Sequence, residues 1–196
     1  KSSKEKWQLI LSTKKLKAWV KTYKYLGEES GYNKGFLARD EGMAEVAKSY
    51  LDQKASAPMV IWAHIGHLAF DNLKIKSAEE FLSSGKLLGT LLKEKIGAGY
   101  SLIGLMAKKT SVTLPDGSHA SFEALPNSLE SKAGDGPAVN LLEPNDLKPL
   151  GLLTIGNTTN ADLPAKQTYL KITMSPLEQF DYAAIVDEAF AMTEVK

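Results

Sequence analysis

Apolar residues near the amino terminus recur at the three- to four-residue spacing of an amphipathic helix. This spacing predicts one helix over residues 1–26, in which lysines take most of the polar positions. A second helix is expected from Gly35 to Asp52. The apolar stripe predicted for the first helix is Trp7, Ile10, Leu11, Trp19, Val20, Tyr23 and Leu26, and the buried face predicted for the second is Met43, Val46, Ala47, Tyr50 and Leu51.

The middle of the chain alternates between strand and helix patterns. An uninterrupted apolar run over 59–63 predicts a strand covered on both faces. Helical spacing over 87–96 follows, with Gly97 as its expected end. A second buried strand is expected over 100–105. The order strand, helix, strand predicts a βαβ unit, and therefore a parallel pair of strands joined by a right-handed crossover.

Shorter patterns dominate the rest of the chain. Segments 112–114 and 120–122 flank a Pro-Asp-Gly turn and predict a hairpin. The fold class is therefore α/β, with a partly parallel sheet, flanking helices, a late antiparallel hairpin and extra strands. Those extra strands are expected over 138–142, 152–155, 169–173 and 183–186. Residues 1–34 form a basic helix and linker, 35–106 a helix plus the βαβ unit, and 107–196 short strands and loops, within one domain or the carboxyl-terminal portion of a larger one.

Composition narrows the classes of function. The 196 residues include 24 basic and 23 acidic side chains and no cysteine, which excludes a disulfide scaffold and a thiol nucleophile. Lysines crowd the first helix, but the remaining chain offers no basic track, so we expect a solvated lysine face and no nucleic-acid partner. No apolar stretch approaches the roughly 18 residues of a membrane span. We expect a cytoplasmic protein, with an exported and processed form as the alternative.

Two of the three histidines, His64 and His67, directly follow the predicted strand over 59–63. Sites in α/β sheets gather at the carboxyl ends of strands, and imidazole transfers protons near neutral pH. The alternative is a pair of polar residues that bind backbone carbonyls. The pair would supply two metal ligands, and Asp71 is a conceivable third. Because zinc sites usually need three or four protein ligands, a metal at His64 and His67 is the less favoured alternative, and we predict no metal and no cofactor.

Arg39 is the only arginine among the 24 basic residues, and Asp40 follows it directly. A guanidinium offers a planar, bidentate fork that lysine lacks. One interpretation is a clamp for a carboxylate of a substrate or of a catalytic residue. The other is an ion pair on a helix surface with little effect.

These motifs together resemble the erythromycin esterase family. That family has an Arg-Asp-x-x-Met-Ala helix, a Trp-Ala-His-Asn-x-His strand end, and a glycine-bounded helix before a strand that ends in Ile-Gly. The resemblance spans most of residues 36–190, with Ile65 in place of the family's asparagine. The matching segments here are Arg39–Ala44, Val60–His67, Gly89–Gly97 and Tyr100–Gly104.

The resemblance implies a hydrolase unrelated to serine hydrolases, in which histidine activates water to cleave a small-molecule ester or lactone. Residue by residue, it makes His64 and His67 catalytic and places Arg39 and Asp40 around the substrate pocket. Opening of macrolide lactones would connect the protein with antibiotic resistance.

Family chains are considerably longer and carry another essential histidine and a glutamate in their amino-terminal half. Because this chain starts at Lys1 without methionine, we expect a carboxyl-terminal part that a missing half completes in cis or in trans. The 196-residue chain alone is then expected to be inactive on esters. The alternative is a non-catalytic binding or interaction domain with the same fold.

Overall fold

The computed structural model describes residues 2–28, 31–53, 58–63, 65–77, 83–113, 119–124, 128–132, 139–147, 153–155, 157–158 and 172–189. The chain divides into two compact units. The first comprises residues 1–73 and 80–100, and its described secondary structure is helical; the second comprises 74–79 and 101–196 and contains the sheets.

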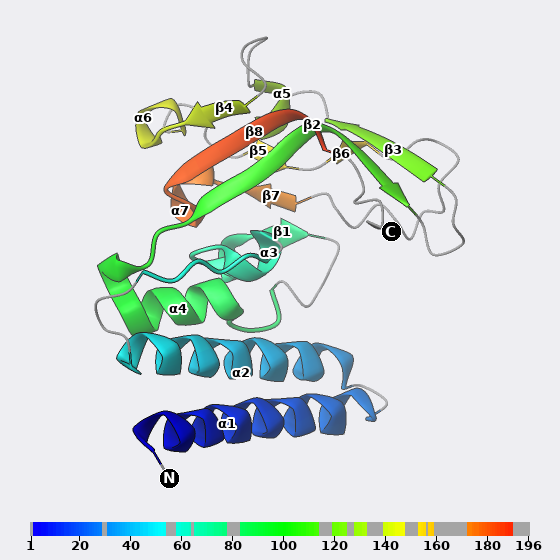
Figure 1. Cartoon of the computed structure of the whole chain (residues 1–196). Coiled ribbons are helices and arrows are strands. Elements are labelled where there is room, and N and C mark those ends of the chain that lie inside the picture. The colour runs from blue at the N-terminus through cyan, green and yellow to red at the C-terminus, as the bar shows by residue number, and fades with distance from the viewer. Residues whose placement is uncertain are drawn as a thin grey trace, which may run out of the picture. The chain divides into compact units, whose positions relative to one another are not determined.

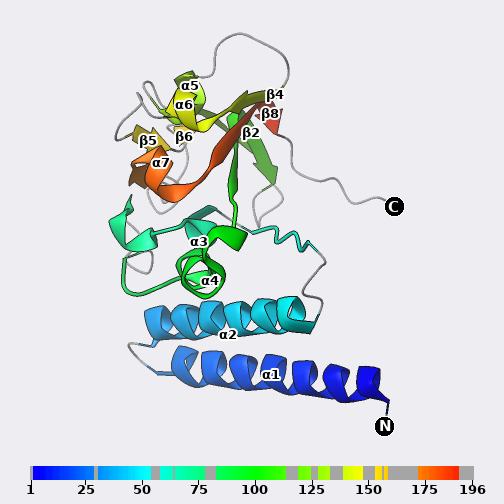
Figure 2. The ribbon, with the colours of Figure 1, turned by 90° about the vertical axis from the view of Figure 1, so that its left-hand side faces the viewer.

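Three helices form the body of the first unit. In Figure 1 and Figure 2 alike, α2 (Tyr32–Gln53) lies between α1 (Ser3–Leu26) and α4 (Leu88–Ile96). The helices expected over 1–26, 35–52 and 87–96 are thereby confirmed, with small differences at their ends. The described part of this unit also contains the short helices α3 (Ile65–Leu68), η1 (Asn72–Lys74), whose last residue belongs to the second unit, and η3 (Gly97–Gly99).

Local sequence explains how these helices begin and end. Ser2 and Glu5 form a capping box at the start of α1, in which each side chain accepts a hydrogen bond from the other's backbone N–H. Gly97 ends α4 at a positive φ of 61°. That backbone conformation suits glycine because residues with a β carbon rarely adopt a positive φ, whatever the space around them.

The antiparallel packing of α1 against α2 depends on small residues. A β carbon on Gly42 would lie only 2.2 Å from the β carbon of Ala18, so the two helices approach closely at this point. Trp7 packs edge-on against Tyr50 with ring centroids 5.0 Å apart. Lys21 pairs with Glu41 on the opposite helix, and this contact raises the pKa of Lys21.

The predicted buried faces need correction. Of the residues predicted for α2 only Ala47 is buried, because α2 turns its small residues toward its neighbours. In α1 only Leu11 of the apolar stripe is buried, and Trp19 is 57% exposed. The buried α2 residues are Gly35, Ala38, Asp40, Ala44 and Ala47.

The prediction of a strand over 59–63 is wrong. Residues 58–63 pair with no described strand, and Val60 and Trp62 are 90% and 82% exposed. An apolar run can be covered on both faces only when strands or helices flank it on both sides. His64, which follows this segment, lies outside the described residues.

The second unit contains a mixed five-stranded sheet in the order β4-β8-β2-β3-β6. Among the described strands, β2 (Ile103–Thr113) and β8 (Tyr182–Ala189) are the one parallel pair, and they lie side by side in Figure 1 and Figure 2. The α/β class with a partly parallel sheet is therefore confirmed, but the parallel partner of β2 is β8 and not the segment over 59–63 as predicted. The other strands of this sheet are β4 (Val139–Leu142), β3 (His119–Ala124) and β6 (Asn157–Thr158).

The predicted hairpin is confirmed as β2 and β3, whose last pair is Thr113 with His119. The strand expected over 100–105 begins only at Ile103, and it is covered on one face, because Ile103 is 58% exposed while Met106 is buried. A second, antiparallel sheet has the order β1-β7-β5. Its strands are β1 (Lys76–Ser77), β7 (Ile172–Met174) and β5 (Leu153–Ile155), and short helices α5 (Leu129–Lys132), α6 (Pro144–Leu147) and α7 (Pro176–Gln179) accompany the two sheets.

Candidate functional site

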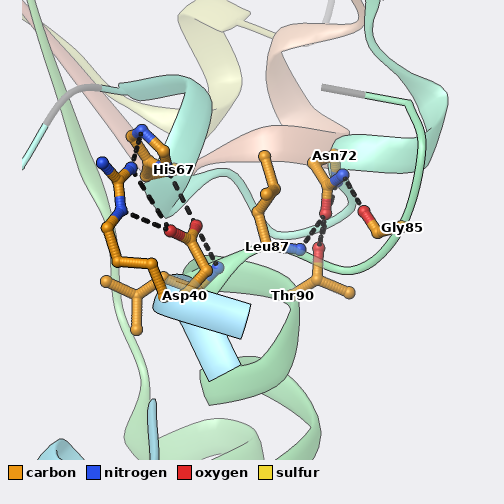
Figure 3. A network of polar contacts seen from close by, with 8 residues as sticks. Asp40, His67, Asn72, Gly85, Leu87 and Thr90 are labelled. Atoms are coloured by element: carbon orange, nitrogen blue, oxygen red, sulfur yellow. Dashed lines mark hydrogen bonds and ion pairs between the residues drawn. The ribbon is translucent and has the colours of Figure 1, made fainter. Parts of the chain in front are cut away.

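The side chain of Asp40, on α2, is fully buried and anchors a polar network in the helical unit (Figure 3). Its Oδ2 accepts a hydrogen bond from the Leu88 N–H at 3.0 Å and one from His67 Nδ1 at 2.7 Å. Leu88 opens α4, whose preceding residue Leu87 has no side chain able to cap it. The carboxylate therefore caps α4 from a distant part of the chain, at the helix end where negative charge is favourable.

The partners of His67 determine its tautomer. His67 lies on α3 with a side chain 15% exposed. Its Nε2 lies 3.0 Å from Arg39 Nη2, and a guanidinium can only donate, so Nε2 is the acceptor. Nδ1 therefore carries the proton and donates a hydrogen bond to Asp40 Oδ2. The hydrogen bonds thus describe a neutral imidazole with its lone pair on Nε2.

Arg39 stands at the edge of this network, partly in solvent. Its side chain is 40% exposed, and its guanidinium stacks on the Phe36 ring at 4.5 Å. Its distance to Asp40 Oδ1 is 3.5 Å from both Nε and Nη2, which is long for a hydrogen bond. The carboxylate is therefore held mainly by His67 and Leu88, while Arg39 keeps donors available.

A second polar network holds the adjoining loop against α4 (Figure 3). Asn72 Oδ1 accepts hydrogen bonds from Leu87 N–H at 2.9 Å and from Thr90 Oγ1 at 2.7 Å, and Asn72 Nδ2 donates to the Gly85 carbonyl at 2.7 Å. Sequence reasoning missed these residues. Leu87 could have indicated them, because a helix that begins after an apolar residue needs hydrogen-bond acceptors from elsewhere in the chain for its first N–H groups.

A cavity of about 640 Å³ lies in the same helical unit. Residues of α1 and α2 form most of its lining, and Met59, Ile61 and Leu88 complete it. Three of the seven residues of the apolar stripe of α1, Trp19, Tyr23 and Leu26, line this cavity and so stay exposed. Arg39 belongs both to the cavity lining and to the network around Asp40.

Three of the four predicted site residues thus come together: Arg39, Asp40 and His67 form one contact network. His64 lies outside the described residues, so its position relative to them stays a prediction. Among the described residues, no group of three or more histidine, aspartate or glutamate side chains is arranged to hold a metal ion. Within the same residues, no helix combines the length and apolar character needed to span a membrane.

The fold and the network define a mixed α/β protein with a buried carboxylate paired to a histidine. The sequence profile of the erythromycin esterase family matches residues 1–189. The chain belongs to the erythromycin esterase family, as the motifs predicted. The match also includes α1, which the motif resemblance had left out. No curated protein sequence matches the chain.

Solved structures share the fold at low sequence identity. A protein from Bacillus cereus has a TM-score of 0.60 and 20% identity, over 84% of this chain and 41% of its own. A succinoglycan biosynthesis protein has a TM-score of 0.58 and 20% identity, over 81% and 40%. A histidine-to-asparagine mutant of erythromycin esterase EreC in its open conformation has a TM-score of 0.55 and 16% identity, over 83% and 40%. The chain therefore spans about two fifths of the length of the structures that it matches.

Proposed function

We propose that this chain supplies the histidine side of a site that hydrolyses carboxylic esters or lactones. The observation that carries the proposal is the hydrogen-bonded chain from a fully buried Asp40, through His67, to Arg39. Membership of the erythromycin esterase family supports the same reaction class. The substrate would be a small-molecule ester or lactone.

Each residue has a role that its contacts suit. A carboxylate on Nδ1–H holds an imidazole in the tautomer whose Nε2 can accept a proton, which makes Asp40 a positioning residue. His67 would act as general base for water. Arg39, which now donates to Nε2, would turn to the substrate carbonyl oxygen, and its partial exposure leaves room for that movement. His64 stays the second predicted catalytic histidine.

The proposed hydrolysis needs water, His67 as proton acceptor and donor, and Arg39 as stabilising cation. Water attacks the carbonyl carbon while His67 Nε2 takes a proton from it, and the negative charge that forms on the carbonyl oxygen is stabilised by Arg39. The tetrahedral intermediate then collapses, the carbon–oxygen bond to the alcohol breaks, and Nε2–H returns the proton to the leaving oxygen. The products are the acid and the alcohol.

The test uses the gene product that carries these residues and a panel of p-nitrophenyl esters together with erythromycin. His67→Ala should lower kcat/KM by about 10²- to 10⁴-fold, the usual contribution of a general base. His64→Ala tests the second histidine in the same assay. The matched control is His119→Ala, which removes the remaining histidine from β3 and should leave the rate unchanged. Turnover that survives His67→Ala would overturn the role of this residue.

A second candidate is a non-catalytic binding domain, which the apolar cavity of about 640 Å³ favours. Small-molecule sites commonly occupy about 300–1,000 Å³ and are mostly apolar. Ligand binding to the wild-type gene product without hydrolysis of any ester in the panel would favour this candidate over the hydrolase.

A further inference from the structure

The charged side chains that line the cavity of the helical unit, among the described residues, are all basic. Its lining is largely apolar, with aromatic and aliphatic side chains from α1 and α2. The charged residues among the described lining are Lys15 and Arg39, and none of these lining residues is acidic. A ligand there would meet apolar walls and two cations.

Arg39 joins this cavity to the Asp40–His67 network. Its guanidinium stacks on Phe36, which also lines the cavity, and reaches His67 Nε2 at 3.0 Å. Leu88 makes a second connection, since it lines the cavity while its backbone N–H binds Asp40. A group bound by Arg39 from inside the cavity would therefore lie beside the lone pair of His67.

We propose that the cavity binds the acyl part of an apolar carboxylic ester and selects against ligands that carry a positive charge. The inference rests on the proposed hydrolysis, because it places the ester carbonyl at Arg39. The volume of about 640 Å³ accommodates a drug-sized or medium-chain acyl group. After hydrolysis the free acid keeps the same position, with its carboxylate on the guanidinium, so the acid is a ligand in its own right.

Binding of the acid tests this without any turnover. Calorimetry on the gene product compares decanoate with decyltrimethylammonium, both below their micelle-forming concentrations. The two probes share a ten-carbon chain and differ in the sign of the head group. Decanoate should bind at least about tenfold more tightly, because a charge-assisted hydrogen bond contributes more than one such factor.

Variants locate the binding. Arg39→Gln should weaken decanoate at least about tenfold, and Arg39→Lys should fall between it and the wild type because lysine keeps the charge without the planar fork. The matched control, Lys95→Gln, removes the same charge from α4 outside the cavity lining and should have no effect. Val46→Trp fills the cavity and should abolish binding of decanoate. Its control, Leu9→Trp, adds the same indole at an exposed position of α1 outside the cavity lining and should leave binding unchanged. Circular dichroism checks the folding of each variant.

Three results would overturn the inference: equal affinity for the two probes, unchanged affinity in Arg39→Gln, or no binding of decanoate to the wild type because another segment fills the cavity. The two proposals fail separately. Decanoate binding that needs Arg39, without hydrolysis of any ester, supports the cavity and contradicts the hydrolase. Hydrolysis that is indifferent to Val46→Trp, which changes the cavity and leaves Arg39, Asp40 and His67 in place, contradicts the cavity alone.

Discussion

The contacts of Asp40 allow the loss in the free energy of unfolding to be estimated for its replacement by alanine. The carboxylate is fully buried and accepts hydrogen bonds from Leu88 N–H and His67 Nδ1. Each buried donor that loses its acceptor costs about 1–3 kcal/mol. The Leu88 N–H is buried, while the His67 side chain is 15% exposed and recovers some solvation. We expect Asp40→Ala to lower the free energy of unfolding by about 3 kcal/mol, within the range of about 3–5 kcal/mol for breaking a buried pair.

Urea unfolding followed by tryptophan fluorescence measures this loss. Trp7, Trp19 and Trp62, the three tryptophans of the chain, all belong to the first unit, so the signal reports on the helical unit. The matched control is Asp52→Ala, which removes a largely exposed aspartate of α2 that pairs with a lysine one turn away. The control should cost no more than about 0.5 kcal/mol. A loss below about 1 kcal/mol for Asp40→Ala would refute the reasoning, because the buried Leu88 N–H alone should cost about 1–3 kcal/mol when it loses its acceptor.

Three further substitutions test the packing and the electrostatics. Gly42→Ala places a methyl group 2.2 Å from a side chain of α1 and should cost about 1–3 kcal/mol in urea unfolding, whereas Gly27→Ala meets only ordinary contacts and should be nearly neutral. Gly97→Ala meets no atom within 4 Å yet should cost about 1 kcal/mol because of its positive φ; a neutral result would contradict that assignment. A hydrogen bond from Lys95 lowers the pKa of Glu45, so the small loss in Glu45→Gln, at most about 0.5 kcal/mol, should be present at neutral pH and vanish as pH falls through that lowered pKa. A loss that grows on acidification would contradict this sign.

Local patterns predicted the helices well and the burial poorly. Helical spacing is a property of neighbouring residues, so α1, α2 and α4 were predictable from the sequence. Which side of a helix is buried depends on its neighbours: α2 has helices on two sides and buries small residues such as Ala38 and Ala44 rather than Met43. The prediction of a strand over 59–63 was wrong for the same reason. Both faces of such a run are covered only if other elements flank it, and the local sequence pattern does not show which elements lie there.

In the candidate site too, local patterns were predictable from the sequence and long-range contacts were not. The lone arginine and the histidine spacing predicted that Arg39, Asp40 and His67 belong to the site, and the structure brings these three together. The sequence did not predict that Asp40 caps α4, because that contact joins residues 48 positions apart. It also missed Asn72, whose bonds to Thr90 and Leu87 span 18 and 15 positions. Contacts of this range follow from the tertiary arrangement and not from local spacing.

Asp40 and Arg39 hold His67 as a neutral imidazole with the proton on Nδ1, the tautomer on which the proposed hydrolysis depends. A long-range ¹H–¹⁵N correlation spectrum of the histidine rings, recorded at a pH where His67 is neutral, tests this directly. We predict a protonated, pyrrole-type Nδ1 and a pyridine-type Nε2 for His67, with this preference weakened in Asp40→Asn. A protonated Nε2 in the wild type, or a tautomer indifferent to Asp40→Asn, would contradict the account.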